Sequence, residues 1–213
     1  MVRMLVGLAL DPPRGLASDR FAALVRASLG DLELAAASID KTRLFELARA
    51  SGLRAADGDV AAGVDAAVAV AGALGYPVIV RAGLGTGGAG TARCENADDV
   101  AAAVRAVRVP DGWTPPGPAR VLVQRFVDGP VIVRASLAWR GGEIAGCTRG
   151  RLATYPHAFG PGSAVVFAGI PSIANATRAL LRALDATGYA GTQFIVEPGT
   201  GAPLLLEINR RMV

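Results

Sequence analysis

The stretch from Gly75 to Cys94 constrains the fold of this chain more than any other segment. Gly75 and a proline lead into a β-branched run that ends on the cation Arg81. The next residues contain five glycines, Gly83, Gly85, Gly87, Gly88 and Gly90. Because glycine has no Cβ, the backbone N–H groups of such a loop can approach an anion closely. The stretch therefore predicts a strand that leads into an anion-binding loop.

The position of the next helix argues against a dinucleotide-binding loop. Gly83, Gly85 and Gly88 match the spacing G-x-G-x-x-G, but that motif requires a helix to begin inside it and receive the pyrophosphate. Here Thr91–Cys94 follows, and a helix is expected only from Asn96. The P-loop signature Gly-Lys-Ser/Thr is also absent. We predict a flap of two strands joined by glycines that folds over phosphates; a purely structural turn is the alternative.

Composition limits the classes of partner. The 213 residues are 52% hydrophobic and 19% charged, which is typical of a globular chain of one domain or two lobes. Lys41 is the only lysine among 22 lysine and arginine residues, and one lysine in such a chain hints at a required compact charge. With no run of basic residues and no interleaved aromatic residues, we expect no nucleic-acid partner.

The ends of the chain and its cysteines indicate the setting. The apolar segment Met1–Leu10 is too short to cross a membrane and lacks a signal-peptide cleavage pattern, so we expect no membrane partner. Cys94 and Cys147 lack metal-ligand spacing and are expected to be small, reduced core residues. These features predict a cytoplasmic protein.

Local signals predict a mixture of strands and helices. Helices are expected at 21–29, from 40 to Gly52, and at 60–74, 96–107 and 171–188, and strands at 4–9, 78–81, 121–127, 131–139, 143–147, 192–197 and 203–209. Asp40 and Asn96 are the expected N-caps, with Asp99 at a capping-box position. The Pro- and Gly-rich segment 109–118 is the best boundary between two lobes. The pattern predicts an α+β fold.

The two C-terminal strands bring three oxygen-bearing side chains to one face. A five-residue turn would pair Glu197 with Pro203 and place Gln193 beside Glu207, with Cβ atoms about 5 Å apart. Asn209 follows on the same face. Magnesium prefers oxygen ligands, and a carboxylate within an apolar run is costly to bury without a cation. We predict a metal site at Gln193, Glu207 and Asn209; a half-exposed edge pair is the alternative.

These pieces resemble the ATP-grasp superfamily, most closely the ATP-grasp domain of the carbamoyl phosphate synthetase large chain and related carboxylate–amine ligases. The segments that carry the resemblance, in order, are Asp40–Lys41, Gly75–Arg81 with its glycine flap, Val121–Val127, Gln193–Phe194 and Leu206–Arg211. Many superfamily members carry lysine where Arg81 stands, whereas the synthetase-type domains carry arginine and a Gln, Glu and Asn metal trio. The resemblance implies an ATP-grasp fold, two α+β lobes with the nucleotide site between them.

The resemblance also implies a role for each matching residue. Lys41 and Arg81 would contact the nucleotide phosphates under the flap, and Arg211 would steady the transferring phosphoryl group together with Arg81. Arg149 and Arg151 could line the site. The backbone of four residues would form the adenine edge: Gln124, Arg125, Phe126 and Val127.

The implied activity is that of an ATP-dependent carbon–nitrogen ligase. With ATP and Mg²⁺ (or Mn²⁺), it would activate a small-molecule carboxylate as an acylphosphate, which an amine or ammonia then attacks. The expected layout is a remnant of a preceding N-terminal domain at 1–36, a small lobe with the flap at 37–119, and a large lobe with the metal site at 120–213.

Three departures from the family pattern leave a second reading open. The acidic residue expected after the adenine strand, for the ribose hydroxyls, is replaced at best by Asp128. The usual Asn-Pro-Arg is Asn209-Arg210-Arg211, and the substrate-side segments that normally follow it are expected to be missing. The N-terminal domain that normally precedes such lobes is expected to be reduced to residues 1–36. The alternative is a truncated or degenerate, non-catalytic module that binds nucleotide or a partner protein. A homodimer or a partner subunit could supply the missing segments.

Overall fold

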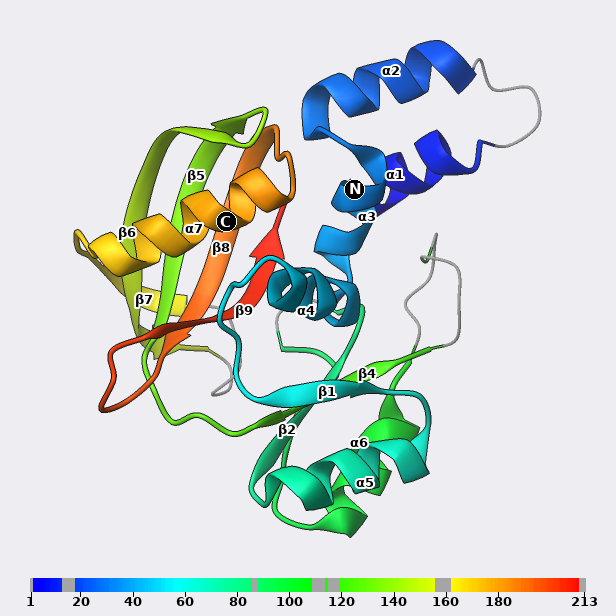
Figure 1. The fold of residues 1–213 in the computed structure, drawn as a ribbon, viewed down its shortest axis with the longest axis vertical. Helices are drawn as coiled ribbons and strands as arrows, with labels where there is room; N and C mark the ends of the chain where they lie inside the picture. Colours follow the sequence, from blue (N-terminus) through cyan, green and yellow to red (C-terminus); the bar gives the residue numbers. More distant parts are fainter. Residues whose placement is uncertain are drawn as a thin grey trace.

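The chain folds around two antiparallel sheets (Figure 1). The computed structural model describes residues 2–12, 18–85, 88–108, 114, 119–155 and 162–210. None of the helices in these segments is long and apolar enough to cross a membrane. Cys94 and Cys147 are not joined by a disulfide; Cys94 is buried as expected, whereas Cys147 is exposed and the expectation of a core residue is wrong there.

The larger sheet has the strand order β7-β6-β5-β8-β9. Its strands are β5 (Val131–Trp139), β6 (Gly142–Thr154), β7 (Gly162–Phe167), β8 (Gly188–Val196) and β9 (Pro203–Asn209). The β5–β6 hairpin turns at Arg140 and Gly141, which both have positive φ as a two-residue hairpin requires. This sheet forms most of the second lobe.

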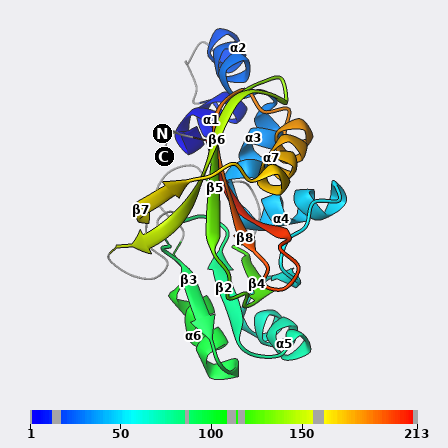
Figure 2. The ribbon, with the colours of Figure 1, turned by 90° about the vertical axis from the view of Figure 1, so that its left-hand side faces the viewer.

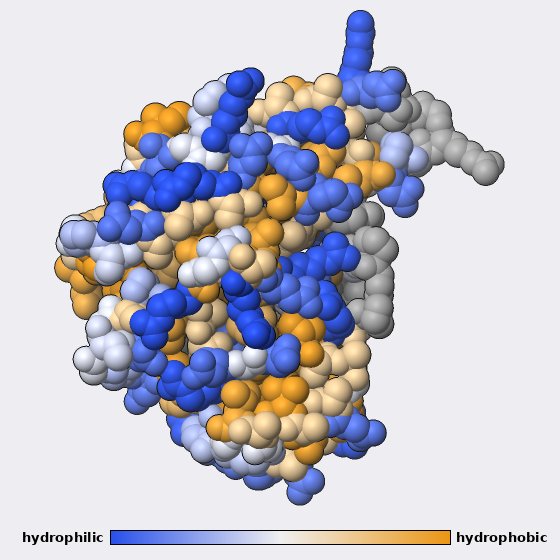
Figure 3. All heavy atoms as spheres, in the orientation of Figure 1, coloured by the Kyte–Doolittle hydropathy of each residue, from blue (hydrophilic) through white to orange (hydrophobic). Residues whose placement is uncertain are grey.

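One helix, α7 (Pro171–Ala183), packs on one face of the larger sheet (Figures 1 and 2). Ile173, Leu180 and Leu181 of its inner side are fully buried, and Figure 3 shows hydrophilic side chains along its outer side. Its Thr177 is hydrogen-bonded to Thr192 of β8 at 2.8 Å between the hydroxyl oxygens. Because successive strand residues alternate faces, Gln193 points to the opposite face of the sheet.

The smaller sheet has the order β1-β4-β2-β3. Its strands are β1 (Gly58–Ala61), β2 (Val78–Ala82), β3 (Thr91–Cys94) and β4 (Val121–Arg125), and the helices against it are α5 (Val64–Leu74) and α6 (Ala97–Ala106). The expected N-cap of α6 is confirmed, because Asn96 Oδ1 accepts from the Asp99 N–H at 3.0 Å. In a capping box the Asp99 carboxylate would accept from the backbone N–H of the N-cap residue Asn96. Here it accepts from the backbone N–H of Glu95, one residue earlier.

Four helices precede the sheets: α1 (Val2–Leu10), α2 (Ser18–Leu29), α3 (Leu32–Ile39) and α4 (Lys41–Ala50). Helix α4 lies between the two sheets, in contact with β9 on one side and with β2 and β4 on the other (Figure 1). Asp40 is its N-cap as predicted, since its Oδ1 accepts from the Thr42 N–H at 2.8 Å. This cap fixes the direction in which Lys41 leaves the helix.

Several expected elements differ from the structure. The predicted strand at 4–9 is wrong: the segment is helical, and Val6 packs against Ala35 and Ala36 of α3. A short apolar run does not distinguish a strand from a buried helix. The first residues of the helix expected at 60–74 belong to β1, and α5 begins after Gly63. Both α3 and β7 were not predicted from the sequence.

The strand at 121–125 lies in a different sheet from the one expected. The sequence-based division places it in the large lobe, but β4 pairs with β1 and β2 in the smaller sheet. The chain crosses to the larger sheet between Arg125 and Val131. Segment 109–118, the expected lobe boundary, lies almost wholly outside the described residues.

Candidate functional site

The predicted neighbours Gln193 and Glu207 do pair across β8 and β9. The turn register is not the expected one, because Pro203 pairs with Val196 rather than with Glu197. A β-bulge at Leu206 then shifts β9 by one residue and restores the Gln193–Glu207 pair. Two shifts of one residue therefore cancel, and the predicted pair forms.

Glu207 lies at the centre of a cluster that joins both sheets and α4. Its Oε1 accepts from Gln193 Nε2 at 2.8 Å and from Asn209 Nδ2 at 3.0 Å. Its Oε2 lies 3.7 Å from Lys41 Nζ and 3.7 Å from Arg81 Nη2. The five residues come from α4, β2, β8 and β9 and stand on the face of the larger sheet that α7 leaves open.

Lys41 connects this cluster to the glycine flap. Its backbone N–H donates to Gly83 O at 2.8 Å, and its Nζ donates to Gly85 O at 2.9 Å. A Cβ at Gly83 would lie 2.7 Å from Asp40 Oδ1, so a side chain there would disturb the N-cap of α4. Burial lowers the pKa of the Lys41 ammonium, and nearby Glu207 opposes that shift. The ammonium is thus costly to bury and is held by a carbonyl and a carboxylate.

Arg81 is the penultimate residue of β2 and is only 8% exposed. Its Nη1 donates to Leu206 O at 2.8 Å. Leu206 is the extra residue of the β-bulge, and such a residue is left out of the ladder, so its carbonyl can accept from a side chain. Burial lowers the pKa of Arg81, and Glu207 again opposes the shift. The bulge therefore supplies an acceptor for this cation.

Arg151 adds a third cation on the same face. It lies on β6, and its Nη2 donates to Gln193 Oε1 at 2.6 Å. Burial lowers its pKa, Glu207 opposes that shift, and the neighbouring Arg149 adds to it. Since Arg149 and Arg151 are two residues apart on one strand, both point toward the open face.

The flap is a hairpin in which the glycine-rich residues 83–90 connect β2 to β3. β2 and β3 pair in the register Arg81 with Thr91, and the Ala82 N–H donates to Gly90 O at 2.7 Å. Gly88 and Gly90 have φ of +82° and +70°, which L side chains rarely adopt. Gly87 lies outside the described residues. The strand–glycine–strand interpretation is confirmed, and the expected role of the loop stays a prediction.

Much of the predicted adenine edge already has partners. The Arg125 N–H donates to Asp57 O at 2.8 Å and the Phe126 N–H to Pro77 O at 3.2 Å. The Gln124 side chain is buried and donates to Ala56 O at 3.1 Å. A base bound here could therefore use these two backbone N–H groups only by displacing their partners. The backbone of Val127, beyond the end of β4, is the better candidate.

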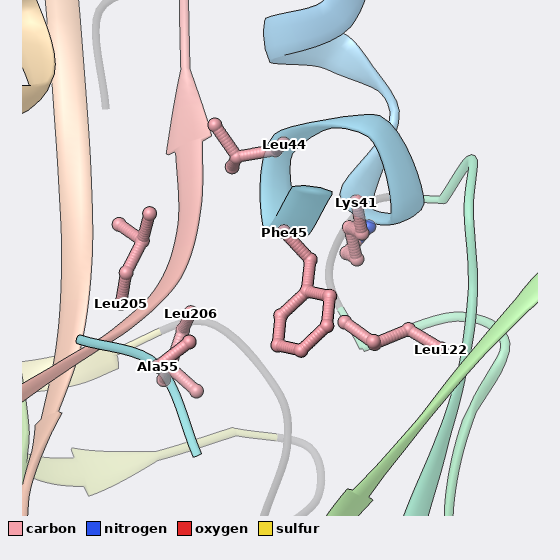
Figure 4. Close-up of a pocket in the computed structure, with 7 residues that line it drawn as sticks. All are labelled: Lys41, Leu44, Phe45, Ala55, Leu122, Leu205 and Leu206. Carbon is pink, nitrogen blue, oxygen red and sulfur yellow. The ribbon is translucent and has the colours of Figure 1, made fainter. Parts of the chain in front are cut away.

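A small apolar cavity adjoins the charged cluster (Figure 4). Its wall comes from α4, β4, β9 and the segment before β1, and its lining residues are Lys41, Leu44, Phe45, Ala55, Leu122, Leu205 and Leu206. Its volume of about 10 Å³ is room for about one water molecule. A nucleotide would therefore lie outside this cavity, over the open face of the sheet.

The donor set around Glu207 suits a magnesium ion that keeps other ligands. The described residues contain no group of three or more His, Cys, Asp or Glu side chains that could hold a metal. Glu207, Gln193 and Asn209 bring one carboxylate and two amide groups together. Magnesium is often bound through one or two carboxylates and substrate phosphates, so these residues fit the ion if an anionic substrate completes its coordination. Arg211, the remaining predicted residue, lies outside the described part of the chain.

The fold matches solved structures of ligases and carboxylases along most of the chain. D-alanyl-alanine synthetase A from Vibrio cholerae has a TM-score of 0.68 at 16% identity, over 86% of this chain and 58% of that one. The biotin carboxylase domain of Hydrogenobacter thermophilus 2-oxoglutarate carboxylase, solved with MgADP and bicarbonate, has a TM-score of 0.67 at 18% identity, over 100% and 51%. D-alanine–D-alanine ligase from Bacillus anthracis has a TM-score of 0.61 at 17% identity, over 86% and 60%.

These matches define an ATP-grasp fold, and the chain spans between about half and three fifths of the structures it matches. Residues 40–138 match the family model described as "Carbamoyl-phosphate synthase L chain, ATP binding domain". A search of curated proteins gave no match. The segment that is similar to this family model contains Lys41, Arg81 and the flap, the same residues that carry the resemblance in the sequence.

Proposed function

We propose that this chain is the ATP-binding portion of an ATP-grasp ligase that activates a small-molecule carboxylate with Mg-ATP. The observation that carries the proposal is the convergence of Lys41 and Arg81 on Glu207, with Oε2 of that carboxylate 3.7 Å from each cation. Among the described residues, Glu207 is the only carboxylate within ion-pair distance of either cation. With Arg151 nearby, positive charge is in excess, and a polyphosphate would balance it.

The cations of the free protein are held by groups that phosphates can replace. Lys41 donates to Gly85 O and Arg81 to Leu206 O, and both lie near Glu207. When phosphate oxygens take over these cations, the Glu207 carboxylate is released for a magnesium ion. That ion, when bound, would neutralise charge on the phosphates. Nucleotide and metal would therefore bind cooperatively.

The proposed chemistry is phosphoryl transfer followed by acyl transfer. A carboxylate oxygen of the substrate bonds to the γ-phosphorus of ATP as the bond to the β,γ-bridging oxygen breaks, which gives an acylphosphate and ADP. An amine or ammonia then attacks the acyl carbon, and inorganic phosphate leaves. Lys41 and Arg81 would hold the phosphates in line and neutralise their charge. A Gly-rich flap tied to Lys41 would cover the reacting groups from water.

A second candidate is a module that binds nucleotide without catalysis. The segment after β4 offers only Asp128 for the ribose hydroxyls, and this residue is exposed. Such a module would share the phosphate-binding residues but would turn over no substrate. Carboxylate-dependent ADP release in the presence of hydroxylamine distinguishes the two, because an acylphosphate is trapped as a hydroxamate.

Thermal unfolding with ATP, in the presence and absence of Mg²⁺, tests nucleotide binding directly. A ligand at a hundredfold excess over its dissociation constant adds about 2.7 kcal/mol to the free energy of unfolding. We expect this stabilisation in the wild type with Mg-ATP, and we expect Glu207→Ala to be stabilised by ATP to the same extent with and without Mg²⁺. Glu46→Ala, which removes an exposed carboxylate paired with Arg120, should respond like the wild type. No response of the wild type to Mg-ATP would overturn the proposal.

A further inference from the structure

A buried arginine follows directly after Asn209. The Arg210 side chain leaves the end of β9 and is only 5% exposed. Its Nη2 donates to Leu29 O at 2.6 Å and to Thr187 O at 2.8 Å. Leu29 is the last residue of α2, and Thr187 immediately precedes β8. One guanidinium thus connects the end of β9 to two segments far away in the sequence.

This guanidinium has no carboxylate partner in the described part of the chain. Burial lowers the pKa of Arg210 to about 10. Its Nε and Nη1 are buried without a hydrogen-bond partner, and a buried unsatisfied donor is costly. What favours the cation is the C-terminal end of α2, where unpaired carbonyl groups carry partial negative charge. A residue this costly to bury is poorly explained by stability alone.

The two segments that Arg210 contacts are themselves in close backbone contact. The Thr187 N–H donates to Leu29 O at 3.3 Å. A Cβ at Gly30 would lie 2.1 Å from Asp185 O, and one at Gly188 would lie 2.8 Å from Ser28 O. Both glycines also have positive φ. The anchor for Arg210 is therefore a close-packed junction.

We propose that Arg210 is a positioning residue that fixes the end of β9 and so holds Asn209 against Glu207. β9 is an edge strand, and its last residue, Asn209, pairs with Gly191 of β8 on one side only. The end of an edge strand is prone to fraying, and the Asn209–Glu207 hydrogen bond at 3.0 Å needs a fixed backbone. The Arg210 side chain provides that restraint from the other direction.

The inference rests on the proposed function, since its consequence is the geometry of the metal ligands. It also gives the N-terminal helices a role, because the end of α2 is half of the anchor. Residues 18–39 then support the site rather than only precede it. Groups that orient metal ligands typically change metal affinity by about 10–100-fold when they are removed.

Arg210→Met separates positioning from stability. Replacing a buried charge by an apolar side chain of similar length is often neutral or stabilising, so we expect a melting temperature equal to or above that of the wild type. We expect the affinity of Arg210→Met for Mn²⁺ at saturating ADP, measured by electron paramagnetic resonance, to be about 10-fold or more below that of the wild type. ADP affinity without metal should be unchanged. Arg210→Lys, which keeps a donor for the two carbonyl groups, should recover part of the Mn²⁺ affinity.

Two results would overturn this role. An unchanged Mn²⁺ affinity in Arg210→Met would show that the anchor does not position Asn209. If the melting temperature and the metal-free ADP affinity both fall along with the Mn²⁺ affinity, Arg210 is a purely structural residue. Arg178→Met is the matched control: this arginine of α7 pairs with Glu143 of β6, away from the Arg210 junction, and its loss should leave Mn²⁺ binding like that of the wild type.

A wild type that binds neither ADP nor Mn²⁺ contradicts the proposed function instead. In that case the NMR signal of the Asn209 side-chain amide, assigned with Asn209→Asp, still tests the anchor. We expect its hydrogen exchange to be faster in Arg210→Met, and an unchanged rate would refute the positioning role.

Discussion

Lys41 Nζ lies 3.7 Å from Glu207 Oε2 and also donates to Gly85 O at 2.9 Å. One ammonium group therefore joins α4, the flap and the carboxylate of β9. An anion that attracts the Lys41 ammonium away from its present position would therefore release both the Glu207 carboxylate and the Gly85 carbonyl group. Under the proposed function, this arrangement would couple the position of the flap to the binding of nucleotide phosphates and of a metal at Glu207.

Glu207→Gln should strengthen the binding of metal-free ATP. The substitution removes the negative charge that Lys41 and Arg81 now face, so both cations become available to phosphate. An ion pair worth about 1 kcal/mol corresponds to roughly fivefold tighter binding. The same substitution should abolish the gain in affinity that Mg²⁺ gives the wild type. Isothermal titration with ATP in EDTA and in Mg²⁺ measures both effects.

Glu197→Gln is the control for that experiment. Glu197 also pairs with two arginines, Arg54 and Arg125, but it lies outside the Lys41 cluster. Its ATP affinities should match those of the wild type in both buffers. Weaker metal-free binding in Glu207→Gln would contradict the idea that the carboxylate competes with phosphate for the cations.

Nucleotide affinity should fall as the pH rises toward 10.5, the ordinary pKa of lysine. Burial lowers the pKa of Lys41, so this ammonium loses its proton at a lower pH than an exposed lysine, and a neutral amine does not attract phosphate. Lys41→Arg stays protonated across this range and should show a flatter profile. Binding of ADP measured from pH 7 to pH 10 in both proteins checks the prediction; parallel profiles would contradict it.

The linked effect on stability has a definite sign. A lysine whose pKa is lower in the folded state binds fewer protons there than in the unfolded chain. The contribution of Lys41 to the free energy of unfolding should therefore rise with pH, within the window between its lowered pKa and 10.5. Comparing the wild type with Lys41→Met by urea unfolding across that window isolates the contribution, because Lys41→Met has no such proton to lose.

The features that the sequence predicted correctly depend on short-range rules. Asp40 is followed by a helix and caps it. The flap has glycines between two strands, and the positive φ angles of Gly88 and Gly90 explain why glycine is favoured at these two positions. Alternation along β8 and β9 was enough to bring Gln193 and Glu207 to one face. Local rules thus recovered the residues of the candidate site that the structure brings together.

What the sequence did not predict depends on contacts between distant segments. The run Leu204-Leu205-Leu206 has no alternation, so nothing in it marks the bulge at Leu206 or the carbonyl that Arg81 uses. The apolar residues of α1 suit either a strand or a helix, and only packing on α3 decides. Likewise, Arg210 resembles any other arginine in an arginine-rich chain until its carbonyl partners are known.

Gly83→Ala should weaken both the N-terminus of α4 and nucleotide binding. The new Cβ would lie 2.7 Å from Asp40 Oδ1, and loss of such a cap costs about 1 kcal/mol. Gly72→Ala is the matched control: nothing lies within 4 Å of its Cβ position inside α5, so it should stabilise the protein by about 0.5–1 kcal/mol. Urea unfolding and ADP titration of the two variants test the pair. If Gly83→Ala and Gly72→Ala bind ADP with the same affinity, the base of the flap does not take part in phosphate binding.

Magnesium alone should bind weakly to the free protein. Lys41 and Arg81 already lie 3.7 Å from the one carboxylate of the predicted metal trio, and Arg151 Nη2 is hydrogen-bonded to Gln193 Oε1 at 2.6 Å. A divalent cation would have to displace these cations, and bound phosphates would offer them an anionic partner in place of Glu207. Mn²⁺ titrated without nucleotide should therefore bind at least tenfold more weakly than with ADP. Arg151→Gln, which removes one competing charge, should reduce the difference between the Mn²⁺ affinities with and without ADP. Equal Mn²⁺ affinities with and without ADP in the wild type would show that the cations and the metal do not compete.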